Sequence, residues 1–295
     1  MKIRLGCQLG YRINGSTTLV LNIQPAETPR QRVLHEVLRI TATDGDGSGG
    51  GEGQAVPYES WTAAVTGNRY LRVRAAAGTA LLVHHEAEVL LEPQVADPAG
   101  INEVPYAELP PEVLPHLWPS RFCESDKLQR LAWREFGAIA PGHGRVTAIC
   151  NWVNDRIAYL RGASNPTTTA TETLLAGAGV CRDFAHLSVA FCRALGIPAR
   201  FVSAHAPGLV PPDFHAVFAA FLGGRWWLFD ATRQAPLDAL VRIGEGRDAA
   251  EAAFAEINGD AVPTGMEVHA EVTEGLDVAH GARTVGAVAD VAEAP

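Results

Sequence analysis

Apolar and polar residues alternate in short stretches between residues 2 and 92. A period of two sends successive side chains to opposite faces of the backbone, which is typical of strands with one buried face. The pairs Asn14-Gly15 and Gly67-Asn68 fall between such stretches and favour tight turns. We therefore expect an antiparallel β-sandwich in the N-terminal part of the chain. The predicted strands are 2–13, 18–23, 33–41, 70–75 and 81–91.

Two segments rich in turn-forming residues interrupt or follow these strands. Glycine dominates residues 44–54, where Asp44, Asp46 and Ser48 superficially resemble a calcium-binding loop. No glutamate stands at the closing position that such a loop needs, so we interpret the segment as the tip of a hairpin. Prolines then cluster between residues 93 and 119, which indicates a linker that ends near Pro119.

A helical period replaces the alternation after residue 125. Apolar residues recur at helical spacing between residues 128 and 157, and we interpret Trp133 and Trp152 as core residues. Further on, Thr169 and Glu172 have the spacing of a capping box, which predicts the start of a short helix.

A second helix is predicted from Cys181 to Leu195. Gly196 and Pro198 would end it, since neither residue continues a helix well. Cys181 would then stand in the first turn, where free amide hydrogens and the positive end of the helix dipole favour a thiolate. The apolar face of this helix consists of Phe184, Leu187, Phe191 and Leu195.

Three strands rich in Phe, Val and Trp are expected at 199–204, 215–222 and 225–232. Gly223-Gly224 would join the last two strands as a two-residue hairpin loop. In that register His215 and Asp230 are diagonal neighbours on one face, roughly 5–8 Å apart between their β-carbons. An odd-numbered loop or a bulge would separate them.

Composition excludes several classes of function. With 295 residues, 47% of them apolar, the chain can bury a large core. A formal net charge of -9 without a basic run offers no basis for binding nucleic acid. We also expect no membrane partner and a cytoplasmic location, because no apolar run is long enough for a signal peptide or a membrane span.

The cysteines do not form a recognisable framework. Their number is odd and no CxxC pair occurs, which argues against a set of disulfides or a zinc knuckle. Cys192 lies eleven residues beyond Cys181, which is roughly 16 Å along a helix and too far for a disulfide. The five cysteines are Cys7, Cys123, Cys150, Cys181 and Cys192.

Together, three residues suit thiol catalysis of acyl transfer. Cys181 would attack an amide or ester carbonyl, His215 would take its proton, and Asp230 would orient the imidazole. The backbone amide of Cys181 is one expected donor to the oxyanion, and the sequence does not identify a second. Each residue alone has an ordinary structural explanation, because a lone cysteine is often a buried thiol and an aspartate often caps a turn.

The motifs around these residues resemble those of the transglutaminase-like superfamily, specifically the bacterial transglutaminase-like cysteine peptidases. The early β region and the run PSRF at 119–122 are also similar to the domain that precedes the catalytic domain in this group. The matching blocks, in order, are GVCRDFAH at 179–186, ALGIPAR at 194–200, DFHA at 213–216 and WLFDAT at 227–232.

The resemblance implies an α+β papain-like catalytic domain without a cofactor or a metal, acting on a peptide or protein amide. Three positions depart from the pattern of many members: Ala219 replaces an acidic residue, Val217 a tryptophan and Ala231 a proline. These departures leave the triad intact and bear on substrate preference.

Several alternatives stay open at this level. The acyl acceptor is either water, as in a peptidase or amidase, or an amine, as in a protein-crosslinking transglutaminase. A catalytically silent binding module with the same fold is a third possibility. A zinc site made of Cys181, His186, Cys192 and His215 is disfavoured, because residues eleven apart on one helix cannot reach the same ion.

Nearby polar residues receive secondary roles. We expect Asp183 to cap the helix or steady a loop and His186 to sit at the edge of the pocket. His205 and Asp213 flank a Pro- and Gly-rich loop that could border the substrate cleft.

In the last part of the chain, the sequence predicts helices at 237–243 and 247–254 and a strand near 266–272. Beyond residue 274 no clear period remains, which favours a disordered tail. The expected organisation is therefore a β-sandwich domain at 1–118, a transglutaminase-like catalytic domain at 119–274 and a tail at 275–295.

Overall fold

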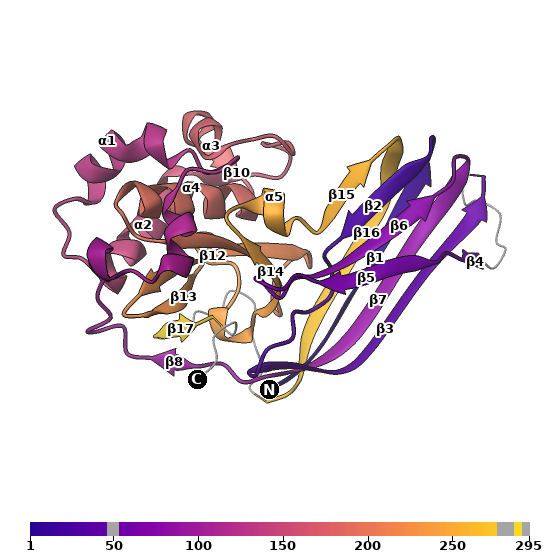
Figure 1. Ribbon diagram of the computed structural model, residues 1–295, viewed down its shortest axis with the longest axis horizontal. Helices are drawn as coiled ribbons and strands as arrows, with labels where there is room; N and C mark the ends of the chain where they lie inside the picture. Colours follow the sequence, from indigo (N-terminus) through magenta and orange to yellow (C-terminus); the bar gives the residue numbers. More distant parts are fainter. Residues whose placement is uncertain (46–52, 276–285, 291–295) are drawn as a thin grey trace.

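Two antiparallel sheets form one half of the molecule in the computed structural model, which describes residues 1–45, 53–275 and 286–290 (Figure 1). The first sheet has the order β16-β1-β7-β3-β4, with bounds Ala261–Glu274, Lys2–Ile13, Thr79–Leu91, Gln31–Asp44 and Gln54–Ala55. The second has the order β15-β2-β6-β5, with bounds Ala255–Asn258, Thr17–Leu21, Arg69–Ala75 and Tyr58–Thr62. Buried residues of both sheets form one hydrophobic cluster, including Leu9, Leu19, Leu71 and Val83.

The alternating pattern located the main strands of this half. All five predicted strands are present, as β1, β2, β3, β6 and β7, with ends that differ by a few residues. Strand β5 was missed because all its residues are exposed, so it carries no apolar alternation. The predicted hairpin tip lies mostly at 46–52, outside the described residues.

The end of the chain returns to the first half. Strand β16 pairs with β1 and strand β15 pairs with β2, both antiparallel. These strands lie in the range 119–274 that the sequence assigned to the catalytic domain. Their partners are more than two hundred residues away, and no local pattern shows such a pairing.

A six-stranded sheet organises the other half, with the order β14-β11-β12-β13-β17-β8. Its bounds in that order are Val241–Gly246, Ala199–His205, Phe214–Leu222, Arg225–Phe229, Ala287–Ala289 and Val95–Ala96. Helix α4 packs against β12 and is itself covered by α1, α2 and α3 (Figure 1). The helices are α1 Ser125–Phe136, α2 His143–Arg156, α3 Ala170–Ala176, α4 Cys181–Ala194 and α5 Ala249–Ala252. The short elements are η1 Tyr106–Glu108, η2 Pro111–Leu117, η3 Leu237–Ala239, β9 Ala158–Tyr159 and β10 Ala178–Gly179.

Several sequence-based expectations about this half are wrong. Residues 237–243 are a 3₁₀ turn followed by strand β14, because pairing with β11 overrides the weak helical pattern. The helix expected at 247–254 is limited to α5. Trp133 is 51% exposed and is therefore not a core residue, whereas Trp152 packs against the core.

The proline-rich linker and the predicted tail both contain ordered structure. The linker carries β8, η1 and η2. In the described part of the tail, 286–290, strand β17 is buried and pairs with β13 and β8. Apolar Ala287 and Val288 complete the sheet there, which differs from the expected disorder. Across the described ranges, every helix is too short or too polar to cross a membrane.

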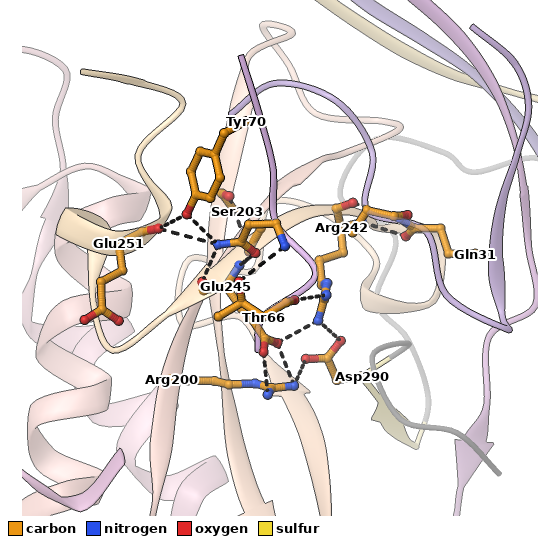
Figure 2. Close-up of polar contacts among 12 residues, drawn as sticks. Gln31, Thr66, Tyr70, Arg200, Ser203, Arg242, Glu245, Glu251 and Asp290 are labelled. Atoms are coloured by element: carbon orange, nitrogen blue, oxygen red, sulfur yellow. Dashed lines mark hydrogen bonds and ion pairs between the residues drawn. The ribbon is translucent and has the colours of Figure 1, made fainter. Parts of the chain in front are cut away.

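A buried polar cluster joins the two halves (Figure 2). Arg200 donates to Glu245 at 2.9 Å and to Asp290 at 2.6 Å, and Arg242 donates to Glu245 at 2.6 Å. Gln31 of β3 exchanges hydrogen bonds of 2.7 and 2.8 Å with the backbone of Arg242 on β14. The half with the six-stranded sheet is thus tied to the first sheet by the hydrogen bonds of Gln31, next to a cluster of paired, desolvated charges.

Candidate active site

Cys181 is the first residue of α4 and is partly exposed. The helix begins where the sequence predicted, because Asp183 accepts a hydrogen bond of 2.8 Å from the backbone amide of Val180. The Asp183 carboxylate is fully buried and also accepts from Ser164 and, at 2.9 Å, from Arg182. Asp183 therefore has the capping role expected of it, and its contacts hold the turn that carries Cys181.

The predicted hairpin register is confirmed. Leu222 pairs with Arg225 and Phe218 pairs with Phe229, so the loop consists of Gly223 and Gly224. Both glycines have left-handed backbone angles, with φ of 59° and 85°, which is the geometry of a tight two-residue hairpin. Regular pairing stops one residue before Asp230, whose side chain turns back toward β12.

His215 and Asp230 meet as the register requires. The imidazole Nε2 of His215 donates to Oδ2 of Asp230 at 2.9 Å, and both side chains are almost completely buried. Asp230 also accepts from the amide and the hydroxyl of Thr232, at 2.8 and 2.7 Å. Burial would raise the pKa of Asp230, but His215 and these hydrogen bonds lower it below the ordinary value, so the carboxylate stays ionised.

Cys181 is the second residue that interacts with His215. Burial alone would lower the pKa of the imidazole, yet Asp230 and Cys181 raise it to about 10. Since Nε2 is bound to Asp230, Nδ1 is the nitrogen left to face the thiol; it makes no hydrogen bond of regular geometry within the described residues. Asp230 is therefore hydrogen-bonded to His215, and Cys181 lies near enough to influence the pKa of the same imidazole.

Tyr159 is a neighbour of Cys181 that the sequence did not indicate. It lies on β9, which pairs with β10 just before α4. Burial and the nearby Cys181 raise the pKa of the Tyr159 hydroxyl. A two-residue strand is too short to show a periodic pattern in the sequence. The neighbourhood of Tyr159 and Cys181 arises only when β9 pairs with β10.

Asn154 of α2 is a second contributor that the sequence missed. Its side-chain amide donates to the carbonyl oxygen of Ala231 at 2.8 Å. This bond anchors the turn after Asp230 to the helical layer, so it supports the position of the carboxylate.

The other candidates from the sequence have different surroundings. His186, expected at the pocket edge, is fully buried, stacks on Phe122 and accepts from the backbone amide of Ala249 at 3.1 Å. His205 is likewise buried, against Phe214. Asp213 remains near the surface and pairs with Arg161 at 3.4 Å.

Metal-ligand and disulfide chemistry have little support in the described ranges. No group of three or more His, Cys, Asp or Glu residues is arranged there to hold a metal ion. All five cysteines are free thiols, and only Cys181 among them is not buried.

Residues 134–231 match the transglutaminase-like superfamily, a range that includes Cys181, His215 and Asp230. An uncharacterized protein of Mycobacterium leprae is 31% identical over 112 residues, or 35% of this chain and 40% of that protein. One from Mycobacterium tuberculosis is 33% identical over 108 residues, or 32% of this chain and 34% of that protein. The matches thus span well under two thirds of these relatives' length.

A crystal structure extends the similarity to nearly the whole chain. A candidate cysteine protease from Cytophaga hutchinsonii is 38% identical, with a TM-score of 0.86, and the match covers 94% of this chain and 93% of that one. The mixture of helices and antiparallel sheets expected from the sequence is therefore that of a transglutaminase-like fold. The chain belongs to the transglutaminase-like superfamily, in the group of bacterial transglutaminase-like peptidases that its motifs resemble.

Proposed function

We propose that the chain is a thiol-dependent acyl-transfer enzyme that cleaves amide bonds, as a cysteine peptidase or amidase, with Cys181, His215 and Asp230 as its triad. The observation that carries this proposal is the environment of His215, which is hydrogen-bonded to Asp230 at 2.9 Å and is influenced by Cys181 at a helix N-terminus. A buried thiol of purely structural use needs neither an oriented imidazole nor partial exposure.

In the proposed reaction the Cys181 sulfur attacks the amide carbonyl carbon while its proton is held by His215. The tetrahedral intermediate collapses when the imidazolium protonates the leaving amine, and a thioester remains. His215 then takes a proton from water, which attacks the thioester and regenerates the thiol. Asp230 keeps Nε2 protonated, so Nδ1 serves as the base throughout.

Two donors are proposed for the oxyanion. The backbone amide of Cys181 stands at the free end of α4, where no carbonyl of the preceding turn claims it. Cys181 raises the pKa of the nearby Tyr159 hydroxyl, which is therefore close enough to donate to an oxygen formed on the attacked carbon.

We also propose that the fold combines a papain-like catalytic domain with a β-sandwich. A papain-like arrangement is supported by α4, which carries the nucleophile and packs against the sheet that carries the base and the acid. A β-sandwich is supported by the cluster shared between the two N-terminal sheets. We propose a sandwich domain built from 1–118 together with β15 and β16, and a catalytic domain from the rest of the described chain.

We propose that the substrate is a peptide or protein and that the enzyme acts on it in the cytoplasm. The net charge of -9 favours neutral or basic substrates over nucleic acid. Water is the proposed acyl acceptor.

The test compares wild type with Cys181→Ala and Cys192→Ala, since Cys192 lies on the same helix but is fully buried. Wild type and Cys192→Ala should release amine from a peptide-amide library and should react quickly with iodoacetamide near neutral pH. Cys181→Ala should do neither. A silent binding module is indicated if no variant cleaves any amide and no thiol reacts quickly.

The acceptor is tested on the same samples. Reaction in ¹⁸O water should place the label in the released carboxylate. Preferential incorporation of a fluorescent primary amine would instead establish a crosslinking transglutaminase.

A further inference from the structure

A pocket of about 380 Å³ opens between the two N-terminal sheets, away from the proposed triad. It lies between strand β3 of the first sheet and strands β5 and β6 of the second. This volume is within the range of small-molecule sites, but the wall is mostly polar, unlike a usual apolar ligand pocket. The side chains that matter below are Gln24, Glu36, Tyr58, Ser60, Thr62 and Arg69.

Strand β5 directs hydroxyl side chains, and not the usual apolar ones, toward the space between the sheets. Ser60 pairs with Leu71 and Tyr58 pairs with Val73, and directly paired residues point to the same side of a sheet. Leu71 and Val73 are buried in the core, so Tyr58, Ser60 and Thr62 share their inward face. A strand normally places apolar residues there, whereas β5 places three hydroxyl groups, all of them exposed.

Gln24 is the second observation that points to a ligand. It lines the pocket and is only 6% exposed. Its side-chain amide makes no hydrogen bond with any described residue. An amide that lines a pocket and has no protein partner is available to a ligand that supplies both a donor and an acceptor.

The charged groups in the pocket neutralise one another. Arg69 donates to both carboxylate oxygens of Glu36, at 3.2 and 2.6 Å, and His85 contacts the same carboxylate at 2.9 Å. Burial opposes ionisation, but these hydrogen bonds lower the pKa of Glu36 to about 2, so the pair persists at neutral pH. A charged ligand would find no unpaired counter-charge on this wall.

We propose that this pocket is a binding site for a neutral saccharide. Hydroxyl groups of a sugar match the unpaired amide of Gln24 and the hydroxyls of Ser60 and Thr62, which act as donors and acceptors alike. Tyr58, 42% exposed at the end of the row, offers an aromatic ring for the apolar face of a sugar ring. The site is separate from Cys181, so it does not depend on the proposed catalytic function.

The test begins with the full chain on an array of neutral mono- to trisaccharides built from glucose, galactose, mannose and N-acetylglucosamine. Sialylated and sulfated glycans serve as charged comparators. Titration calorimetry with the strongest neutral binder then compares wild type with Gln24→Met, Ser60→Ala and Thr62→Val. Each variant should bind at least tenfold more weakly, and thermal unfolding checks that each is folded.

Two controls give the result its meaning. Glu59→Gln changes the same strand on its outer face, where Glu59 pairs with Arg72, and should leave binding unchanged. Cys181→Ala should also bind like wild type, which separates this site from the catalytic one. The proposal is overturned if the array shows no neutral binder, if charged glycans alone bind, or if binding survives in all three pocket variants.

Discussion

His215 shows how one side chain combines opposing effects. Its complete burial disfavours the charged imidazolium, while ionised Asp230 and the nearby Cys181 favour it, and the balance raises the pKa to about 10. A raised folded-state pKa stabilises the protein fully below the ordinary value of 6.5, and this contribution is lost as pH rises toward 10.

We expect Asp230→Asn to remove most of this effect. Without the carboxylate charge, burial dominates and the pKa of His215 falls. Urea unfolding from pH 6.5 to 10 should show a decline in the free energy of unfolding for wild type that is much smaller in the variant. Amide cleavage should fall by about 100-fold or more, because the imidazole loses its orienting charge. Equal pH profiles for the two proteins would contradict this account of His215.

At the level of elements, local rules placed α4 and the hairpin β12-β13 well. Apolar spacing, a first-turn cysteine and a Gly-Pro ending define α4, and a two-glycine loop sets the register that brings His215 to Asp230. The same rules failed at 237–243, where hydrogen bonds to β11 decide the conformation. The pairing of elements adjacent in sequence was predictable, whereas the pairing of distant elements was not.

Asp183→Ala tests whether the start of α4 must be held in place. The change leaves the Val180 amide without its acceptor and should lower the free energy of unfolding by about 1–3 kcal/mol. The rate of Cys181 alkylation should also fall, since the turn that carries the sulfur loses its anchor. Urea unfolding and timed iodoacetamide labelling measure the two effects.

Thr169→Ala is the matched control for this prediction. Thr169 caps α3 through a capping box with Glu172, and its capping hydrogen bonds do not involve α4. Its loss should cost about 0.5–2 kcal/mol and leave alkylation unchanged. If Asp183→Ala behaves like this control, with stability reduced but reactivity intact, the cap has no part in positioning Cys181.

Across the whole molecule, the half with the six-stranded sheet contains a buried cluster of Arg200, Arg242, Glu245 and Asp290, and the other half is hydrogen-bonded to it through Thr66 and Asn68 (Figure 2). These four residues come from β11, β14 and the segment after β17, and each is less than a tenth exposed. Charges taken out of water in this way are tolerated only while they remain paired.

Glu245→Gln should therefore be strongly destabilising. It leaves Asp290 as the carboxylate shared by Arg200 and Arg242, and breaking a buried pair of this kind costs about 3–5 kcal/mol. Denaturant unfolding followed by tryptophan fluorescence measures the loss. Glu274→Gln, which breaks the exposed pair with Lys2, should change stability little. Similar effects of the two substitutions would show that the buried cluster is not a major contributor to the stability of the fold.

The amino-acid sequence by itself determined the features that depend on near neighbours: the main strands of the first sheets, the helix that starts at Cys181, and the hairpin register of His215 and Asp230. Only the tertiary structure decided the return of β15 and β16 to the first half, the proximity of Tyr159 to Cys181, and the polar pocket under β5. The spacing of apolar residues and the positions of turn-forming residues depend only on residues within one or two elements. Contacts between distant segments arise from the joint packing of many elements, and no single stretch of sequence carries a signal for them.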